Sequence, residues 1–223
     1  RAPPAPHAHT QDMSFCVYPL ATPGARRARV KGLAGEQLRT ITLGPVAAIV
    51  GEVTVRPRPT VANLLRYDRI LTQLWAQNAA LLPVRFGTIL ADSSGLDHAV
   101  TLRGATLRKR LGVVRDRAQM TVLVPIPYPN RRRTPTRRAR SGAEYLRGRA
   151  ALDVPQLARL RPAVRRWVRD ERMQMRGSIA TVYHLVPRGA ADRYRSALER
   201  AAREAGIRLR VLGPRLPYAF SDE

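Results

Sequence analysis

An amphipathic helix is followed by the stretch Leu81-Leu82-Pro83-Val84-Arg85-Phe86-Gly87-Thr88, which determines where that helix ends. Proline fixes its own φ and favours an extended conformation in the preceding residue, so we expect the helix to end near Asn78. A strand is predicted from Val84 to Leu90, with Gly87 permitting a bend. Arg85 lies between two apolar residues, where a guanidinium is costly unless its donors are hydrogen-bonded.

Apolar residues around this stretch recur at the spacings of a mixed α and β chain. Thr60 is the predicted N-cap of a helix reaching about Gln77, with an apolar stripe of Val61, Leu64, Tyr67, Leu71, Leu74 and Trp75. Further strands are predicted at 15–20, 46–53 and 119–126, and a second helix at 94–112. Two helices against an antiparallel sheet of about four strands form an α+β domain, a permuted relative of the ferredoxin-like pattern.

Composition divides the chain into two small domains. We expect residues 1–13 to be a disordered extension and residues 14–127 to form the N-terminal α+β domain. Residues 128–140 hold two prolines and six arginines, which is typical of an extended, solvated linker. The C-terminal domain, 141–223, is also predicted to be α+β, with helices at 143–148, 154–176 and from Ala191 to a Gly206 cap, and strands at 179–186 and 207–211.

Four motifs, in the same order along the chain, resemble the gas vesicle protein F/L family. Residues 81–88 resemble its "LPVRFGT" signature, 44–53 its second strand, 141–146 its "SGxEYL" motif and 213–220 its closing "GPWPPYSF" motif. The likeness covers about residues 15–220. The chain departs from the family at Tyr67, where His is usual, and at Arg215, where Trp is usual.

The resemblance implies a modified ferredoxin-like N-terminal domain and a role in assembling gas vesicles without catalysis or a cofactor. Its members are expected at the gas vesicle or in the cytoplasm, in contact with the small hydrophobic shell protein and other accessory proteins. Strand edges or a sheet face would cover the apolar surface of such a subunit. The motifs supply these candidate structural or partner-binding residues: Pro83, Arg85, Phe86, Gly87, Glu144, Tyr145, Gly213, Pro214, Pro217, Tyr218 and Phe220.

Two of these motifs each allow two interpretations. Arg85 is either a clamp presented to a partner or, as we prefer, a hydrogen-bond donor to the end of the helix near Asn78. The closing segment, with Tyr218 and Phe220, either packs across its own domain and bridges to the first, which we favour, or docks a partner. Truncation after Leu212 separates these last two ideas.

The positive charge of the chain indicates the main alternative function. The formal net charge is +24, nearly all from arginine, and such a surface attracts nucleic acid at low salt. A predicted helix with arginines from Arg159 to Arg176 carries a charge of +5, either a solvated face or a face that binds RNA. A nucleic-acid-binding protein with a ferredoxin-like sheet is therefore the alternative. RNA-reading sheets need several stacked aromatic residues, however, whereas Phe86 stands alone, so no specific nucleic acid is expected.

The remaining chemistry-bearing residues do not predict an enzyme or a metal site. Cys16 lies on a predicted strand and is expected to be a buried small hydrophobe. His98 is expected on a helix surface, and His184 is expected to be a satisfied structural histidine on a strand. Asp170 and Glu171 are adjacent on a predicted helix and therefore diverge. No apolar run approaches the ~18 residues of a membrane span.

Overall fold

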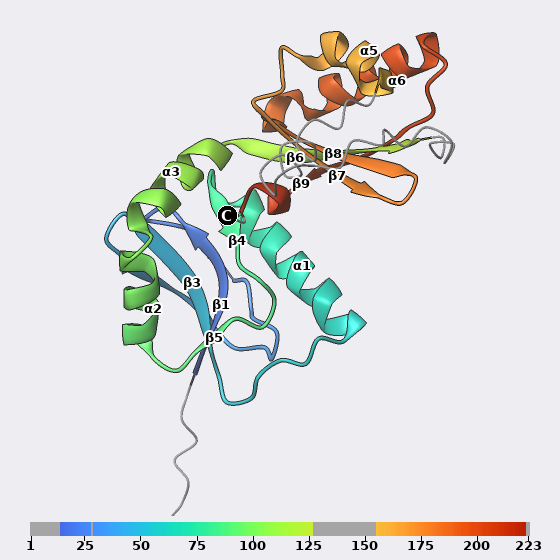
Figure 1. Ribbon diagram of the computed structural model, residues 1–223. Coiled ribbons are helices and arrows are strands. Elements are labelled where there is room, and N and C mark those ends of the chain that lie inside the picture. Colours follow the sequence, from blue (N-terminus) through green and yellow to red (C-terminus); the bar gives the residue numbers. More distant parts are fainter. Residues whose placement is uncertain (1–13, 28, 127–154, 222–223) are drawn as a thin grey trace, which may run out of the picture. The chain divides into compact units, whose positions relative to one another are not determined.

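The computed structural model describes residues 14–27, 29–126 and 155–221 (Figure 1). Two compact units divide this part of the chain. The first contains the residues up to Arg117 together with those from Leu216 onward, and the second runs from Ala118 to Arg215. Each has an antiparallel sheet with helices against it, so the predicted α+β class is confirmed.

The first unit is built on a five-stranded sheet. Its strands are β1 (Ser14–Ala21), β2 (Leu38–Leu43), β3 (Val46–Val53), β4 (Leu81–Pro83) and β5 (Ile89–Leu90). They pair in the order β2-β3-β1-β4, and β5 also pairs with β1. β2 and β3 form a hairpin in which Leu43 pairs with Val46 across Gly44, whose φ of +57° suits a tight turn. β2 is not among the strands predicted from the sequence.

Helices cover both faces of this sheet. In Figure 1, α1 (Val61–Ala76) lies on one face, and α2 (Ser93–Thr101) and α3 (Gly104–Val114) lie on the other. Burial on two faces explains why β1 and β3 are almost continuously apolar rather than alternating. α1 begins as predicted, because the Thr60 Oγ1 accepts a hydrogen bond from the Asn63 N–H at 3.2 Å. The predicted single helix at 94–112 is instead two helices.

In its described residues, the second unit is a four-stranded sheet with two helices on one face (Figure 1). Its elements are β6 (Arg117–Pro125), α5 (Pro155–Val164), β7 (Asp170–Arg176), β8 (Ile179–Pro187), the short helix η2 (Arg188–Ala190), α6 (Ala191–Glu204) and β9 (Arg210–Arg215). The strands pair in the order β7-β8-β6-β9. Their inner faces pack on α5 and α6 around Val122, Val182, Leu160 and Leu198.

The sheet expected for one predicted strand and the extent of one predicted helix are wrong. Residues 119–126 do form a strand, but β6 pairs with β9, for example Val122 with Val211, and so belongs to the second sheet. The predicted helix at 154–176 is α5 followed by β7, because Glu171, Met173 and Met175 alternate with polar residues and pair with β8.

The predicted domain limits differ from the observed units for the same reason. The first unit ends at Arg117 rather than at 127, because β6 has its hydrogen-bonding partners in the second sheet. The predicted linker, 128–140, lies outside the described residues. Within residues 14–27, 29–126 and 155–221, no helix combines the length and the apolar character that crossing a membrane requires.

Candidate functional site

The residues between β4 and β5 leave the sheet as a tight turn instead of continuing the strand predicted to Leu90. Pro83 pairs with Pro19 and Ile89 with Cys16, so residues 84–88 stand opposite only two residues of β1. Both ends of this excursion are tied to β1. The Val84 N–H donates to the Tyr18 carbonyl at 3.1 Å, and the Val17 N–H donates to the Thr88 carbonyl at 3.0 Å.

Local hydrogen bonds close the turn. The Arg85 carbonyl accepts from the Thr88 N–H at 3.2 Å and from the Thr88 Oγ1 at 2.8 Å. Gly87 has a φ of +72°, a conformation that a side chain strains. The Gly87 carbonyl accepts a hydrogen bond from Arg56 Nη2 at 3.1 Å, which joins the turn to the segment before α1.

An aromatic stack holds the turn from the inside. The Tyr67 hydroxyl of α1 lies 2.6 Å from the Val84 carbonyl and 3.1 Å from the Tyr18 carbonyl, and its ring stacks on that of Tyr18. Phe86 meets Tyr67 edge to face, with ring centroids 5.4 Å apart. Burial raises the pKa of Tyr67 above its usual value, so the hydroxyl remains a donor. Phe86 is thereby held inward.

Tyr18 is in turn fixed by a carboxylate. Its hydroxyl donates to Glu36 Oε1 at 2.5 Å and accepts from the Leu33 N–H at 2.7 Å. The neighbouring Cys16 is buried, and this burial, followed by the charge of Glu36, raises the pKa of its thiol to about 11. Since the thiolate is the reactive form, this cysteine has the character of a core residue rather than of a nucleophile.

Arg85 does not make the contact that we preferred from the sequence. The end of α1 is satisfied by Asn78, whose Nδ2 donates to the Leu74 carbonyl at 2.7 Å and to the Arg26 carbonyl at 2.8 Å. The Arg85 side chain is exposed. The predicted hydrogen bond from Arg85 to the helix end is therefore wrong, because a residue at the helix end itself supplies the donor.

Arg85 borders an open hollow of about 680 Å³ in the first unit, which we call the arginine groove. Its lining is Arg56, Pro57, Arg58, Pro59, Leu64, Arg85, Phe86, Gly87 and Thr88. No described carboxylate lines it, and the ion pairs found in the described part of the chain do not include its three arginines. Leu64 is 44% exposed, and α1 continues this apolar surface with Val61 and Leu65.

The closing motif reaches the other side of the same turn. A second hollow of about 540 Å³ shares Leu64, Arg85 and Phe86 with the arginine groove and is also lined by Tyr218. The Tyr218 hydroxyl donates to Asp68 Oδ1 of α1 at 3.0 Å. Leu216 and Phe220 are buried in the first unit, the latter in the short helix η3 (Tyr218–Phe220). Two motifs distant in sequence thus meet beside α1.

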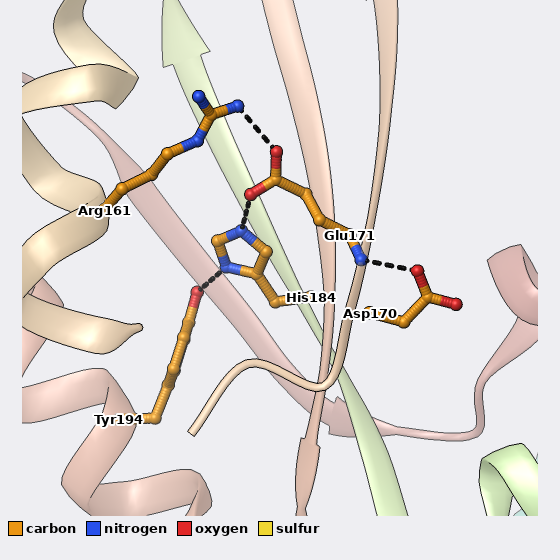
Figure 2. A network of polar contacts seen from close by, with 5 residues as sticks. All are labelled: Arg161, Asp170, Glu171, His184 and Tyr194. Carbon is orange, nitrogen blue, oxygen red and sulfur yellow. Dashed lines mark hydrogen bonds and ion pairs between the residues drawn. The ribbon is translucent and has the colours of Figure 1, made fainter. Parts of the chain in front are cut away.

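The second unit contains a different constellation, a chain of polar contacts around His184 (Figure 2). Its Nε2 lies 2.8 Å from Glu171 Oε2, and its Nδ1 lies 2.5 Å from the Tyr194 hydroxyl. Arg161 Nη2 donates to Glu171 Oε1 at 2.7 Å. A carboxylate can only accept, so Nε2 carries a hydrogen, and in the neutral ring Nδ1 then accepts from Tyr194.

This network resembles an acid–base relay, but the described residues around it leave no room for a substrate. The Tyr194 and His184 side chains are buried, and the adjoining cavity, lined mainly by leucine and valine, measures about 10 Å³. Such a volume holds at most one water molecule. The hydrogen bond from His184, and then that from Arg161, lowers the pKa of Glu171 to about 2. The contacts therefore serve the fold, as expected for His184.

Comparison with known proteins identifies the family. The family model described as gas vesicle synthesis protein GvpL/GvpF matches residues 14–222. The chain belongs to the GvpL/GvpF family. No curated protein matches the sequence. Among solved structures, GvpF from Anabaena sp. PCC7120 shares 14% identity with a TM-score of 0.73, covering 95% of this chain and 99% of that one. GvpF from Microcystis aeruginosa shares 12% identity with a TM-score of 0.72, covering 94% and 99%.

The GvpL/GvpF motifs are only partly brought together. Pro83, Phe86 and Gly87 build the turn, and Pro217, Tyr218 and Phe220 lie in the first unit with it. Gly213 and Pro214 lie on β9 of the second unit, where Gly213 has a φ of +117° and an added Cβ would stand 2.6 Å from the Gln119 carbonyl. Glu144 and Tyr145 lie outside the described residues.

The predicted basic helix is also corrected. Arg172 and Arg176 lie on β7 rather than on α5, so the arginines counted from Arg159 to Arg176 do not share a helix face. Glu171 and Asp170 likewise stand on a strand, and only Glu171 faces His184. The roles of Asn78 and Glu36 were not predicted, although an asparagine directly after a predicted helix is a usable signal for a helix end.

Proposed function

We propose that this protein is an assembly factor for gas vesicles that acts by binding rather than by catalysis. It binds the hydrophobic shell protein and other gas vesicle accessory proteins, and it is retained with the vesicle as a minor component. The observation that carries the proposal is the match to the gas vesicle synthesis family over residues 14–222.

The surface of the first unit supports a binding role. A hydrogen-bonded turn presents Arg85 beside the exposed apolar side chains of α1, a combination that suits recognition of a protein. A subunit with large apolar surfaces aggregates unless another protein covers it before assembly. The exposed apolar side chains of α1 beside the turn offer such a cover.

Co-purification at two salt concentrations tests the proposal against the nucleic-acid alternative. The tagged protein is isolated from cells with its bound shell protein and total RNA, at low salt and at roughly half-molar salt. We expect shell protein to remain at high salt and RNA to be lost, because phosphate contacts weaken steeply with salt. RNA retained at high salt without shell protein would contradict the assembly role.

A further inference from the structure

The backbone of the turn beside the arginine groove is well hydrogen-bonded, yet the Arg85 side chain at its tip makes no hydrogen bond or ion pair with the described residues. Tyr67, Thr88 and Arg56 each hydrogen-bond to a carbonyl of residues 84–87. The guanidinium groups of Arg58 and Arg85, in contrast, are exposed, and no carboxylate in the described part of the chain pairs with them. Because the backbone of the turn is held by hydrogen bonds and these guanidinium groups are exposed, the site is preorganised to bind a ligand from outside the chain.

The positive charge of the groove favours a ligand with negative charge. Three arginines and no described acidic residue line it, on a chain with a formal net charge of +24. A second copy of the chain would bring a net positive charge toward this surface. An anionic group gains both attraction over distance and hydrogen bonds from the guanidinium forks.

The apolar side chains select the class of ligand. Leu64 lies in the groove, and Val61 and Leu65, 74% and 56% exposed, continue along α1. A phosphate alone would leave this surface in water. A single-stranded nucleic acid would stack on exposed ring faces, whereas the Phe86 ring is half-buried with its contact to Tyr67. A protein segment uses both the charged and the apolar parts.

We propose that the arginine groove binds an acidic segment of a partner protein that carries at least one large apolar side chain. Its carboxylates pair with Arg58 and Arg85, and its apolar side chain rests on Leu64 and Phe86. The inference rests on the proposed function, in which the partners are other gas vesicle proteins, and it names the kind of segment that they present.

Peptide binding by the full chain tests this. The probes are short overlapping peptides that cover the shell and accessory proteins of the same organism, read by fluorescence anisotropy. We expect the peptides that bind to be acidic with a large apolar residue, and we expect Arg85→Glu to weaken their binding by at least about tenfold. Exchange of a peptide's carboxylates for lysine should restore binding to this variant.

Matched variants separate the groove from general charge. Arg108→Glu makes the same change in net charge on an exposed position of α3, and Leu102→Asp matches Leu64→Asp on another exposed leucine. We expect Leu64→Asp to weaken binding and both controls to bind normally. Equal loss in Arg85→Glu and Arg108→Glu, or bound peptides that are neutral or basic, would overturn the inference.

The outcome in which the arginine groove binds no partner can be distinguished from the outcome in which the proposed function is wrong. If Arg85→Glu still captures shell protein from cells as the unchanged chain does, the assembly role stands and the groove is not its surface. If the unchanged chain captures no gas vesicle protein, the proposed function itself is wrong. Thermal melts of all variants establish that each is folded, since every substituted side chain is exposed.

Discussion

The turn between β4 and β5 and the network around His184 use arginine in opposite ways. Arg161 in the second unit is paired with Glu171, which is bonded to His184, which is bonded to Tyr194. In the first unit, Arg85 stands on a well-bonded backbone and contributes no described ion pair. Polar residues that bond within their own fold are thus distinguishable from a polar residue that the described fold leaves exposed, and substitution should separate the two kinds.

The largest effect on stability is expected at the centre of the network. His184→Ala leaves a cavity and removes a partner from both Glu171 and Tyr194, so the free energy of unfolding should fall by about 3 kcal/mol. Urea denaturation measures it. The control His98→Ala, on the exposed surface of α2, should change stability by less than about 0.5 kcal/mol. Equal effects at both histidines would mean that the contacts of His184 stabilise the fold no more than an exposed side chain does.

Acid should weaken the same network. The folded pKa of Glu171, about 2, lies below its ordinary value of 4.5, so its stabilisation is full above about pH 4.5 and is lost as the pH falls toward 2. Because Glu171 is partly exposed, we expect a loss of about 1–2 kcal/mol over this window. Urea denaturation across this pH range should show a flatter profile for Glu171→Gln than for the control Glu204→Gln. Parallel profiles would mean that folding does not lower the pKa of Glu171.

A smaller effect is expected where the turn is bonded to α1. Tyr67→Phe removes the hydroxyl that bonds to the Val84 carbonyl and keeps the ring, so stability should fall by about 1 kcal/mol. Amide hydrogen exchange of residues 84–88 should become faster. Tyr183→Phe, whose hydroxyl lies 3.4 Å from Gln174 at the surface, should leave both measurements unchanged. Unaltered exchange in Tyr67→Phe would show that the turn does not depend on this bond.

The smallest effect on stability is expected at the tip of the turn. Arg85→Lys keeps the charge and loses the planar fork of donors, so stability should stay within about 0.5 kcal/mol. Peptide binding to the arginine groove should nevertheless weaken several-fold. A clear drop in the melting temperature would show that the Arg85 side chain contributes to the stability of the fold.

Features determined by neighbouring residues were predictable from sequence. The Thr60 cap lies three residues from its donor, α1 follows a single apolar stripe, and β3 occupies the predicted bounds of 46–53. The sequence left two interpretations of Arg85 open, and the wrong one was preferred because Asn78, which bonds to the end of α1, was not considered as a donor.

Features determined by distant partners were missed or misplaced. The residues of β7, Asp-Glu-Arg-Met-Gln-Met-Arg, include good helix formers, and pairing with β8 overrides that local preference. β6 was predicted as a strand, but its partner β9 lies far along the chain, and no feature of the nearby sequence indicates this pairing. The contact of Tyr218 with Asp68 has the same origin.

The return of Leu216–Phe220 to the first unit has a consequence for the order of synthesis. A ribosome that has passed Arg117 has made every strand of the first sheet, but Leu216 and Phe220 of its core come only after residues 118–215. At the usual rate of translation, that delay is roughly 5–20 s. The hollow completed by Tyr218 is therefore absent from the nascent chain, and the surface around Arg85 reaches its final form only when this last segment has emerged.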